Sequence, residues 1–103
     1  IFEYTGIFGH VNAATISNLG IKNLNIHKST NGSVGGVIGR GGATVTNCYI
    51  KDSNIKLTAS GTVGIFVSTV RTASSFTNCY VYNCTVSGKS GNTVCGFVGT
   101  IEN

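Results

Sequence analysis

The sequence predicts an all-β fold, a parallel β-solenoid (β-helix) of about three and a third coils with ~30 residues per coil. Three observations carry this prediction. One glycine-containing apolar segment occurs four times along the 103 residues at nearly constant intervals. Valine, isoleucine, threonine, serine, asparagine and 15 glycines dominate the composition, as strands and turns require. The units do not show the sustained helical pattern of apolar residues at i, i+3 and i+4 that an amphipathic helix would need.

The first repeated element is this six-residue apolar segment. Its four copies begin 30, 29 and 31 residues apart, and they occupy 4–9, 34–39, 63–68 and 94–99. In this alignment Tyr4 takes the place of Val34, Val63 and Val94. An antiparallel sandwich also contains short strands and glycine-rich turns, but its strands are not copies of one another. The repeat therefore favours the solenoid over the sandwich.

A second element with a central asparagine follows each of the first three copies. Its copies are 15–21, 44–50 and 75–81; a weaker third element spans 24–26, 53–55 and 84–86, and polar turns close each unit at 29–33, 58–62 and 89–93. From each of Asn18, Asn47 and Asn78 to the next repeat valine is 16 residues every time. Length variation is therefore expected only between the first and second elements, because a surface loop can lengthen while a strand in register cannot.

Stacked units form one domain, residues 1–103, with coils at about 4–33, 34–62 and 63–93 and a partial coil at 94–103. Stacking at ~4.8 Å per rung pairs each strand with its copies above and below, so equivalent residues form columns. The predicted inward columns are Ile16/Val45/Phe76, Ile21/Ile50/Val81 and Ile26/Ile55/Val86. By alternation, the outward positions are Thr15, Ser17, Thr44, Thr46, Ser75 and Thr77. Asn18, Asn47 and Asn78 fall where the chain bends, and their stacked amides are expected to form an asparagine ladder.

The repeat resembles the GLUG-motif repeat. The segment 36–40 followed by 45–50 carries this resemblance; 64–66 with 76–81 is a second copy, and 6–9 with 16–19 is a degenerate third. The resemblance covers nearly the whole chain, although Leu19 and Gly20 replace Cys-Tyr in the first coil and Val67-Ser68 breaks the closing glycine in the third coil. It implies a parallel β-solenoid of large secreted or surface-displayed proteins, including adhesins and peptidase stalks.

Two of the four cysteines, Cys48 and Cys79, occupy the same repeat position. Their Cα atoms would then lie roughly 5 Å apart, which is within disulfide reach. The first coil has Leu19 in this slot, so the position is an apolar socket, and buried thiols are favoured over a Cys48–Cys79 bridge. The cysteines do not form two close ligand pairs, so no zinc or other metal site is expected.

The ionisable residues do not form a catalytic pattern. Glu3, Asp52 and Glu102 are the only acids, and no two of them share a repeat position, which argues against a two-carboxylate glycosidase. His10 and His27 are also at non-equivalent positions, and no Ser-His-Asp grouping can be built. We therefore expect no catalytic residues and no cofactor.

The net charge is +4, from seven basic and three acidic residues, and the basic residues are scattered rather than arranged in the stripe of a nucleic-acid binder. No apolar run approaches the ~18 residues that a membrane span requires. The alternative prediction is a non-enzymatic binding surface on the hydroxyl columns with Tyr49 and Tyr80, for surface glycans or, by likeness to Thr-x-Thr solenoids, for ice. Asn31 and Asn83 begin glycosylation sequons that matter only in a secreting eukaryote.

The two ends of the repeat array are apolar strand sequence without a polar cap, at 1–2 and 95–98. Unpaired strand edges invite further pairing. We expect either the remainder of a longer solenoid or head-to-tail copies of the chain to cover them, the latter giving a fibre. The expected function is a non-catalytic structural module of an extracellular or cell-surface protein; the alternative is an adhesin-like glycan-binding or ice-binding module.

Overall fold

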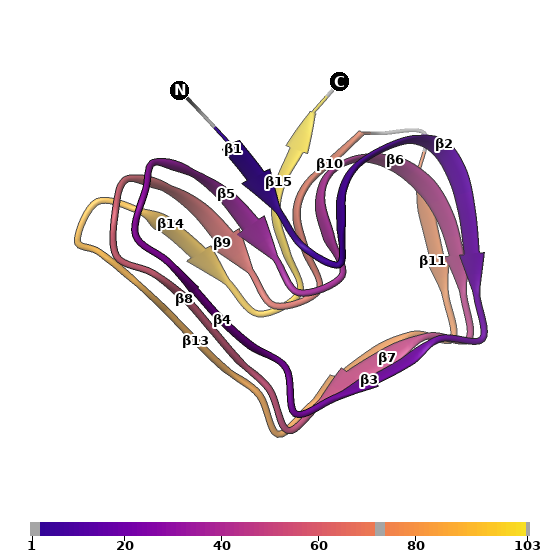
Figure 1. Ribbon diagram of the computed structural model, residues 1–103. Coiled ribbons are helices and arrows are strands. Elements are labelled where there is room, and N and C mark those ends of the chain that lie inside the picture. Colours follow the sequence, from indigo (N-terminus) through magenta and orange to yellow (C-terminus); the bar gives the residue numbers. More distant parts are fainter. Residues whose placement is uncertain (1–2, 72–73, 103) are drawn as a thin grey trace.

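A computed structural model describes residues 3–71 and 74–102. All regular elements in these ranges are β-strands, wound as a parallel β-solenoid of about three turns with about 29 residues per turn (Figure 1). The molecule measures 32 × 30 × 16 Å, so it is wider than it is tall, as expected for a few rungs spaced ~4.8 Å apart. The predicted fold class is confirmed.

Each coil contributes one set of short strands. The first coil contains β1 (Glu3–Thr5), β2 (Phe8–Ser17), β3 (Gly20–Lys22) and β4 (Asn25–Lys28). The second contains β5 (Gly32–Gly35), β6 (Ile38–Thr46), β7 (Tyr49–Lys51) and β8 (Asn54–Leu57). The third contains β9 (Gly61–Gly64), β10 (Val67–Arg71), β11 (Ser75–Thr77), β12 (Tyr80–Tyr82) and β13 (Thr85–Gly88). β14 (Thr93–Cys95) and β15 (Val98–Glu102) begin the fourth.

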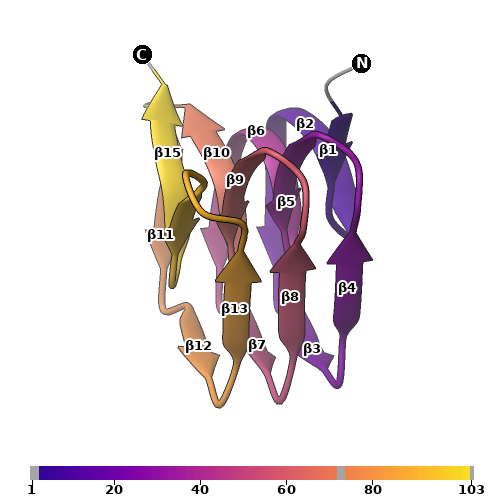
Figure 2. The same cartoon turned by 90° about the vertical axis from the view of Figure 1, so that its left-hand side faces the viewer.

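The strands form four parallel sheets that run along the solenoid axis (Figure 2). We name them by what they carry. The glycine sheet has the order β1-β5-β9-β14; the hydroxyl sheet has β11-β6-β10-β15 with β2 on β6; the tyrosine sheet has β12-β7-β3; and the asparagine-threonine sheet has β13-β8-β4. Each strand therefore pairs with the equivalent strand of the next coil, and all of these pairings are parallel.

The register confirms most of the predicted repeat alignment but corrects its first copy. Val34 pairs with Val63 and Val63 with Val94, as expected. However, Thr5 pairs with Val34, so the predicted equivalence of Tyr4 and Val34 is wrong by one residue. Phe8 nevertheless pairs with Ile38, because the turn between these two pairs is one residue shorter in the first coil.

A β-bulge between Val11 and Ala14 compensates for that shortened turn. Beyond it Thr15 pairs with Thr44 and Ser75 also pairs with Thr44, so the three coils return to register. This bulge lies in the corner where length variation was predicted. The prediction that all variation is confined to this corner is wrong, because the preceding turn varies as well.

The cross-section is re-entrant: the chain runs inward along the glycine sheet, reverses, and runs outward along β2, β6, β10 and β15 (Figure 1). Glycines permit the close backbone approach at this reversal. A Cβ on Gly35 would lie 2.0 Å from the carbonyl oxygen of Ile38, and one on Gly39 would lie 2.8 Å from the amide nitrogen of Thr5 in the inward strand β1. The glycines of the repeated apolar segment therefore bring two backbones together.

The interior is apolar and divided into two clusters. The larger includes Val45, Ile50 and Phe66, each fully buried, and the smaller includes Ile55 and Leu57. The predicted inward columns are confirmed: their middle-coil members are fully buried, and their outer-coil members pack against the same clusters. The predicted outward residues are exposed apart from Thr46, which is half-buried. Across the described residues, the structure contains no helix that is long and apolar enough to span a membrane.

Candidate functional site

The surface predicted to bind ligands is divided between two sheets. Thr15, Thr44 and Ser75 form one column of paired residues on the hydroxyl sheet, and Ser17, Thr46 and Thr77 form the second. Tyr49 and Tyr80 lie on the tyrosine sheet, past the corner at which the chain turns (Figure 1). The expected joint hydroxyl–tyrosine face is therefore wrong: the two groups occupy adjoining faces that meet at an edge.

The asparagine ladder forms this edge. Asn18, Asn47 and Asn78 all adopt the left-handed conformation, with φ of 56°, 55° and 55°. Asparagine tolerates this conformation better than most residues, which explains its recurrence at the bend. Asn47 Nδ2 donates to Asn18 Oδ1 at 3.3 Å, and Asn78 Nδ2 donates to Asn47 Oδ1 at 2.7 Å. The stacked amides thus link the three coils outside the core.

A second ladder, which the sequence reasoning missed, stands at the next corner. Asn23, Asp52 and Asn83 are left-handed there, with φ of 57°, 54° and 52°, and Asn83 Nδ2 donates to Asp52 Oδ1 at 2.7 Å. The signal was an Asn or Asp five residues after each ladder asparagine. A glycan attached to Asn83 would replace one of the two hydrogens of the Nδ2 that donates this bond. Asn31 is exposed in a turn and accepts a bond from the Ser60 amide at 3.1 Å; glycosylation of either residue stays a prediction.

All four cysteines are free thiols. Cys48 is 1% exposed, and its Sγ donates to the Thr46 carbonyl at 3.3 Å; Cys79 Sγ donates likewise to the Thr77 carbonyl at 3.3 Å. Each thiol thus satisfies a carbonyl two residues back, across the left-handed corner. Cys48 is buried and Cys79 is partly exposed, and the preference for buried thiols over a Cys48–Cys79 bridge stays a prediction.

At the next corner a side chain again donates to the carbonyl two residues back, but the donor is a thiol in one coil and a hydroxyl in another. Cys84 Sγ donates to the Tyr82 carbonyl at 3.3 Å, while the middle coil has Ser53 in this slot, whose Oγ donates to the Lys51 carbonyl at 2.9 Å. Ser53 Oγ also accepts from the Leu24 amide at 3.0 Å. In the second and third coils, a short SH or OH group after each of the two corners therefore caps the carbonyl two residues back.

The outer face of the tyrosine sheet is aromatic and basic. The Tyr49 and Tyr80 rings are stacked, with centroids 5.2 Å apart and an interplanar angle of 9°. A Cβ on Gly20 would lie 2.4 Å from Tyr49 Cζ, so the first coil leaves room for this ring. Lys51 Nζ lies 5.8 Å from the Tyr49 centroid. We call Lys22, Tyr49, Lys51, Tyr80 and Tyr82 the tyrosine–lysine face.

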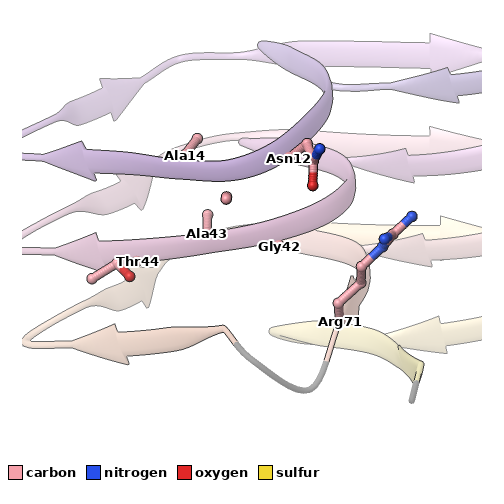
Figure 3. Close-up of a pocket in the computed structure, with 7 residues that line it drawn as sticks. Asn12, Ala14, Gly42, Ala43, Thr44 and Arg71 are labelled. Atoms are coloured by element: carbon pink, nitrogen blue, oxygen red, sulfur yellow. The ribbon is translucent and has the colours of Figure 1, made fainter.

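A hollow of about 330 Å³ lies at the variable corner (Figure 3). Ala13 in its wall has a φ of 55°, a conformation that costs an alanine roughly 1–2 kcal/mol. Its lining residues are Asn12, Ala13, Ala14, Gly42, Ala43, Thr44 and Arg71. Arg71 is the one ionisable group in this lining, so the hollow does not contain an acid–base pair.

The ionisable residues that the structure describes are dispersed. Arg40 Nη1 of β6 donates to the Tyr4 hydroxyl of β1 at 3.2 Å, and the rings of Tyr4 and His10 of β2 lie 5.8 Å apart, so these contacts join the inward and outward strands. Asp52 belongs to the second ladder. No three His, Cys, Asp or Glu side chains in the described ranges are close enough to hold a metal ion together. The expectation that the chain is not an enzyme stays a prediction.

Comparison of the chain with protein-family models, with curated proteins and with solved structures gave no significant match.

Proposed function

We propose that the chain is a non-catalytic structural repeat module of an extracellular or cell-surface protein, and that its two ends accept further coils of the same repeat. One observation carries this proposal: equivalent residues are buried inside the stack and exposed at its ends. Val63 is fully buried, whereas its partner Val94 in the last coil is 41% exposed. Val70 is 4% exposed, whereas its partner Ile101 is 66% exposed.

At the opposite end of the stack, an apolar side chain is likewise exposed while its partner in the middle coil is buried. Phe8 in the first coil is 37% exposed, while its partner Ile38 is fully buried. A hollow of about 390 Å³ is open at this end, with Phe8, Val11, Ala14, Thr15, Ile16, Ser17 and Leu19 around it. A further coil would continue the interface that already joins the coils, column by column. Burying these side chains would contribute ~25 cal/mol per Å² of apolar surface.

The outer strand edges at the two ends of the stack also favour a further coil of the repeat as the partner. β13 and β14 are the last strands of their sheets, and β4 and β1 are the first, so each has pairing groups on its outer side without a strand partner in the described part of the chain. In repeat proteins, stability is a sum of intrinsic and nearest-neighbour terms, and solenoid ends need covering. The GLUG resemblance supports a stalk, spacer or filament role, and the extracellular location rests on that resemblance.

We expect the pure chain to associate end to end, with a sedimentation coefficient that rises with protein concentration. Ile101→Lys should keep the chain monomeric, because a lysine at this apolar end would have to be buried in the contact. Sedimentation velocity measures both outcomes, and electron microscopy shows whether the assemblies are fibres.

Ser75→Lys is the matched control, because Ser75 belongs to the last complete coil but points outward. This variant should associate like the unmodified chain. Head-to-tail association is refuted if the unmodified chain remains monomeric at high concentration, or if both lysine variants associate equally well.

The hydroxyl sheet supports ice binding as a second candidate function. Its two columns are in register over three rungs, and five of the six residues are exposed. Threonine on a solvent-facing strand is also explained by β-propensity alone. Ice binding is tested by measuring the thermal hysteresis of the pure protein. The absence of hysteresis at high protein concentration would eliminate this candidate function.

A further inference from the structure

The tyrosine–lysine face presents unusually large aromatic exposure for so small a sheet. Tyr80 is 50% exposed and Tyr82 is 65% exposed. Both point outward from β12, two residues apart, so their side chains stand ~6.6 Å from each other along the strand. Tyr49 covers one face of the Tyr80 ring. The aromatic surface available to a ligand is therefore Tyr82 and the far side of Tyr80.

Two lysines extend this surface along the solenoid axis. Lys22 pairs with Lys51, and Lys51 pairs with Tyr82, so the three form one straight column across the coils. Lys22 is exposed and Lys51 is half-buried. Asp52 is the acid nearest in sequence, and it accepts a bond from Asn83 in the corner ladder. The column therefore presents two positive charges beside two aromatic rings.

We propose that the tyrosine–lysine face binds an acidic polysaccharide that lies along the solenoid axis. The carboxylates of its uronic-acid residues would pair with Lys22 and Lys51, and its sugar rings would pack against Tyr82 and Tyr80. The ~4.8 Å rung spacing is close to the length of one sugar residue in an extended polysaccharide, so successive sugars meet successive rungs. Charge complementarity selects an acidic chain over a neutral one.

The surroundings favour a saccharide over a nucleic acid. The face is an open sheet surface, whereas binders of single-stranded nucleic acid combine a basic groove with several stacking platforms. The faces of the Tyr49 ring are already occupied by Gly20 and Tyr80. The neighbouring sheet carries Asn54 and Thr85, which are bonded to each other at 2.8 Å and are exposed. Amides and hydroxyls of this kind suit the hydroxyl groups of sugars.

The test measures binding of an oligogalacturonate to the full chain by calorimetry at low ionic strength. A neutral oligoglucan of equal length and an oligothymidylate are the comparison probes. The double variant Lys22→Gln/Lys51→Gln should weaken oligogalacturonate binding about tenfold, and the slope of log affinity against log salt should fall by about two. Tyr82→Ala should weaken binding about fivefold with the salt slope unchanged, because no charge is lost.

Lys89→Gln is the matched control, because Lys89 is exposed but belongs to the turn after β13. It should bind like the unmodified chain, and circular dichroism checks that every variant is folded. The proposal is overturned if the oligogalacturonate does not bind, if the neutral probe or the oligothymidylate binds as tightly, or if Lys89→Gln loses as much affinity as the double variant. Binding is measured at concentrations at which sedimentation shows the chain to be monomeric, because the far side of the Tyr80 ring faces the end at which a further coil would stack. End-to-end association itself is tested by the Ile101→Lys experiment.

Discussion

Replacing Phe66 by alanine is expected to lower the free energy of unfolding by about 3–5 kcal/mol. Phe66 is fully buried, its ring is stacked on Phe97 at 4.8 Å, and its edge-to-face contact with Phe76 is at 5.9 Å. The alanine variant loses the transfer free energy of the ring and leaves a cavity that neighbouring rungs cannot close without losing register. Urea denaturation measures the change, and a failure to fold agrees with it, since whole domains are stable by only ~5–15 kcal/mol.

Phe97→Ala is the matched control for this prediction. Phe97 packs against the same cluster but is only partly buried, because its coil lies at the end of the stack. Phe97→Ala should lower the free energy of unfolding by about half as much as Phe66→Ala, because folding removes a smaller apolar area of Phe97 from water. Equal losses for the two variants would contradict the assignment of Phe66 to the interior and Phe97 to an end.

Gly35→Ala should destabilise the fold by about 3 kcal/mol or more, because overpacking against backbone cannot be relieved by a side-chain rotation. The added methyl group would lie 2.0 Å from the Ile38 carbonyl oxygen and 2.6 Å from the Ser68 amide nitrogen. Relief requires the inward and outward segments of two coils to separate. Thermal unfolding followed by circular dichroism measures the loss.

Gly96 provides a control in the same repeated turn. A Cβ at Gly96 would meet no atom within 4 Å, and this residue is not among the glycines with positive φ. Gly96→Ala should therefore change stability by no more than about 1 kcal/mol, in the stabilising direction if it only restricts the unfolded chain. A loss at Gly96 equal to that at Gly35 would show that the close approach at Gly35 does not govern stability.

The coil repeat was predictable because the spacing between copies is a one-dimensional signal. Columns such as Val45 with Phe76 follow once the copies are aligned, and alternation then places Thr44 and Ser75 outside. The misplacement of Tyr4 had a physical cause. A shortened turn and a later bulge cancel within one coil, so the residue count over the coil conceals both changes.

The three-dimensional shape of the coil was less accessible from the sequence. The corner at Asn18, Asn47 and Asn78 was predicted as a bend, but its angle depends on packing between sheets, so Tyr49 was placed on the wrong face. The re-entrant fold was also missed, because only the approach of Gly39 in β6 to Thr5 in β1 reveals the role of the repeated glycines. Asp52 concealed the second ladder by replacing an asparagine.

The most direct test of end-on coil stacking adds one coil and measures thiol reactivity. A copy of residues 73–103 is placed after Asn103, and in that copy Cys79→Leu, Cys84→Leu and Cys95→Gly follow the residues naturally present at Leu19, Leu24 and Gly64. In the original chain Cys79, Cys84 and Cys95 are partly exposed in the end coils, while Cys48 is buried and serves as the internal reference.

Stacking of the added coil on β12, β13 and β14 would cover the three partly exposed thiols. Their modification rates with an aromatic disulfide reagent should then fall at least about tenfold, toward that of Cys48, because reaction would require the coils to separate locally. Unchanged rates at Cys79, Cys84 and Cys95 in the extended chain would contradict the proposal that the end of the solenoid accepts a further coil.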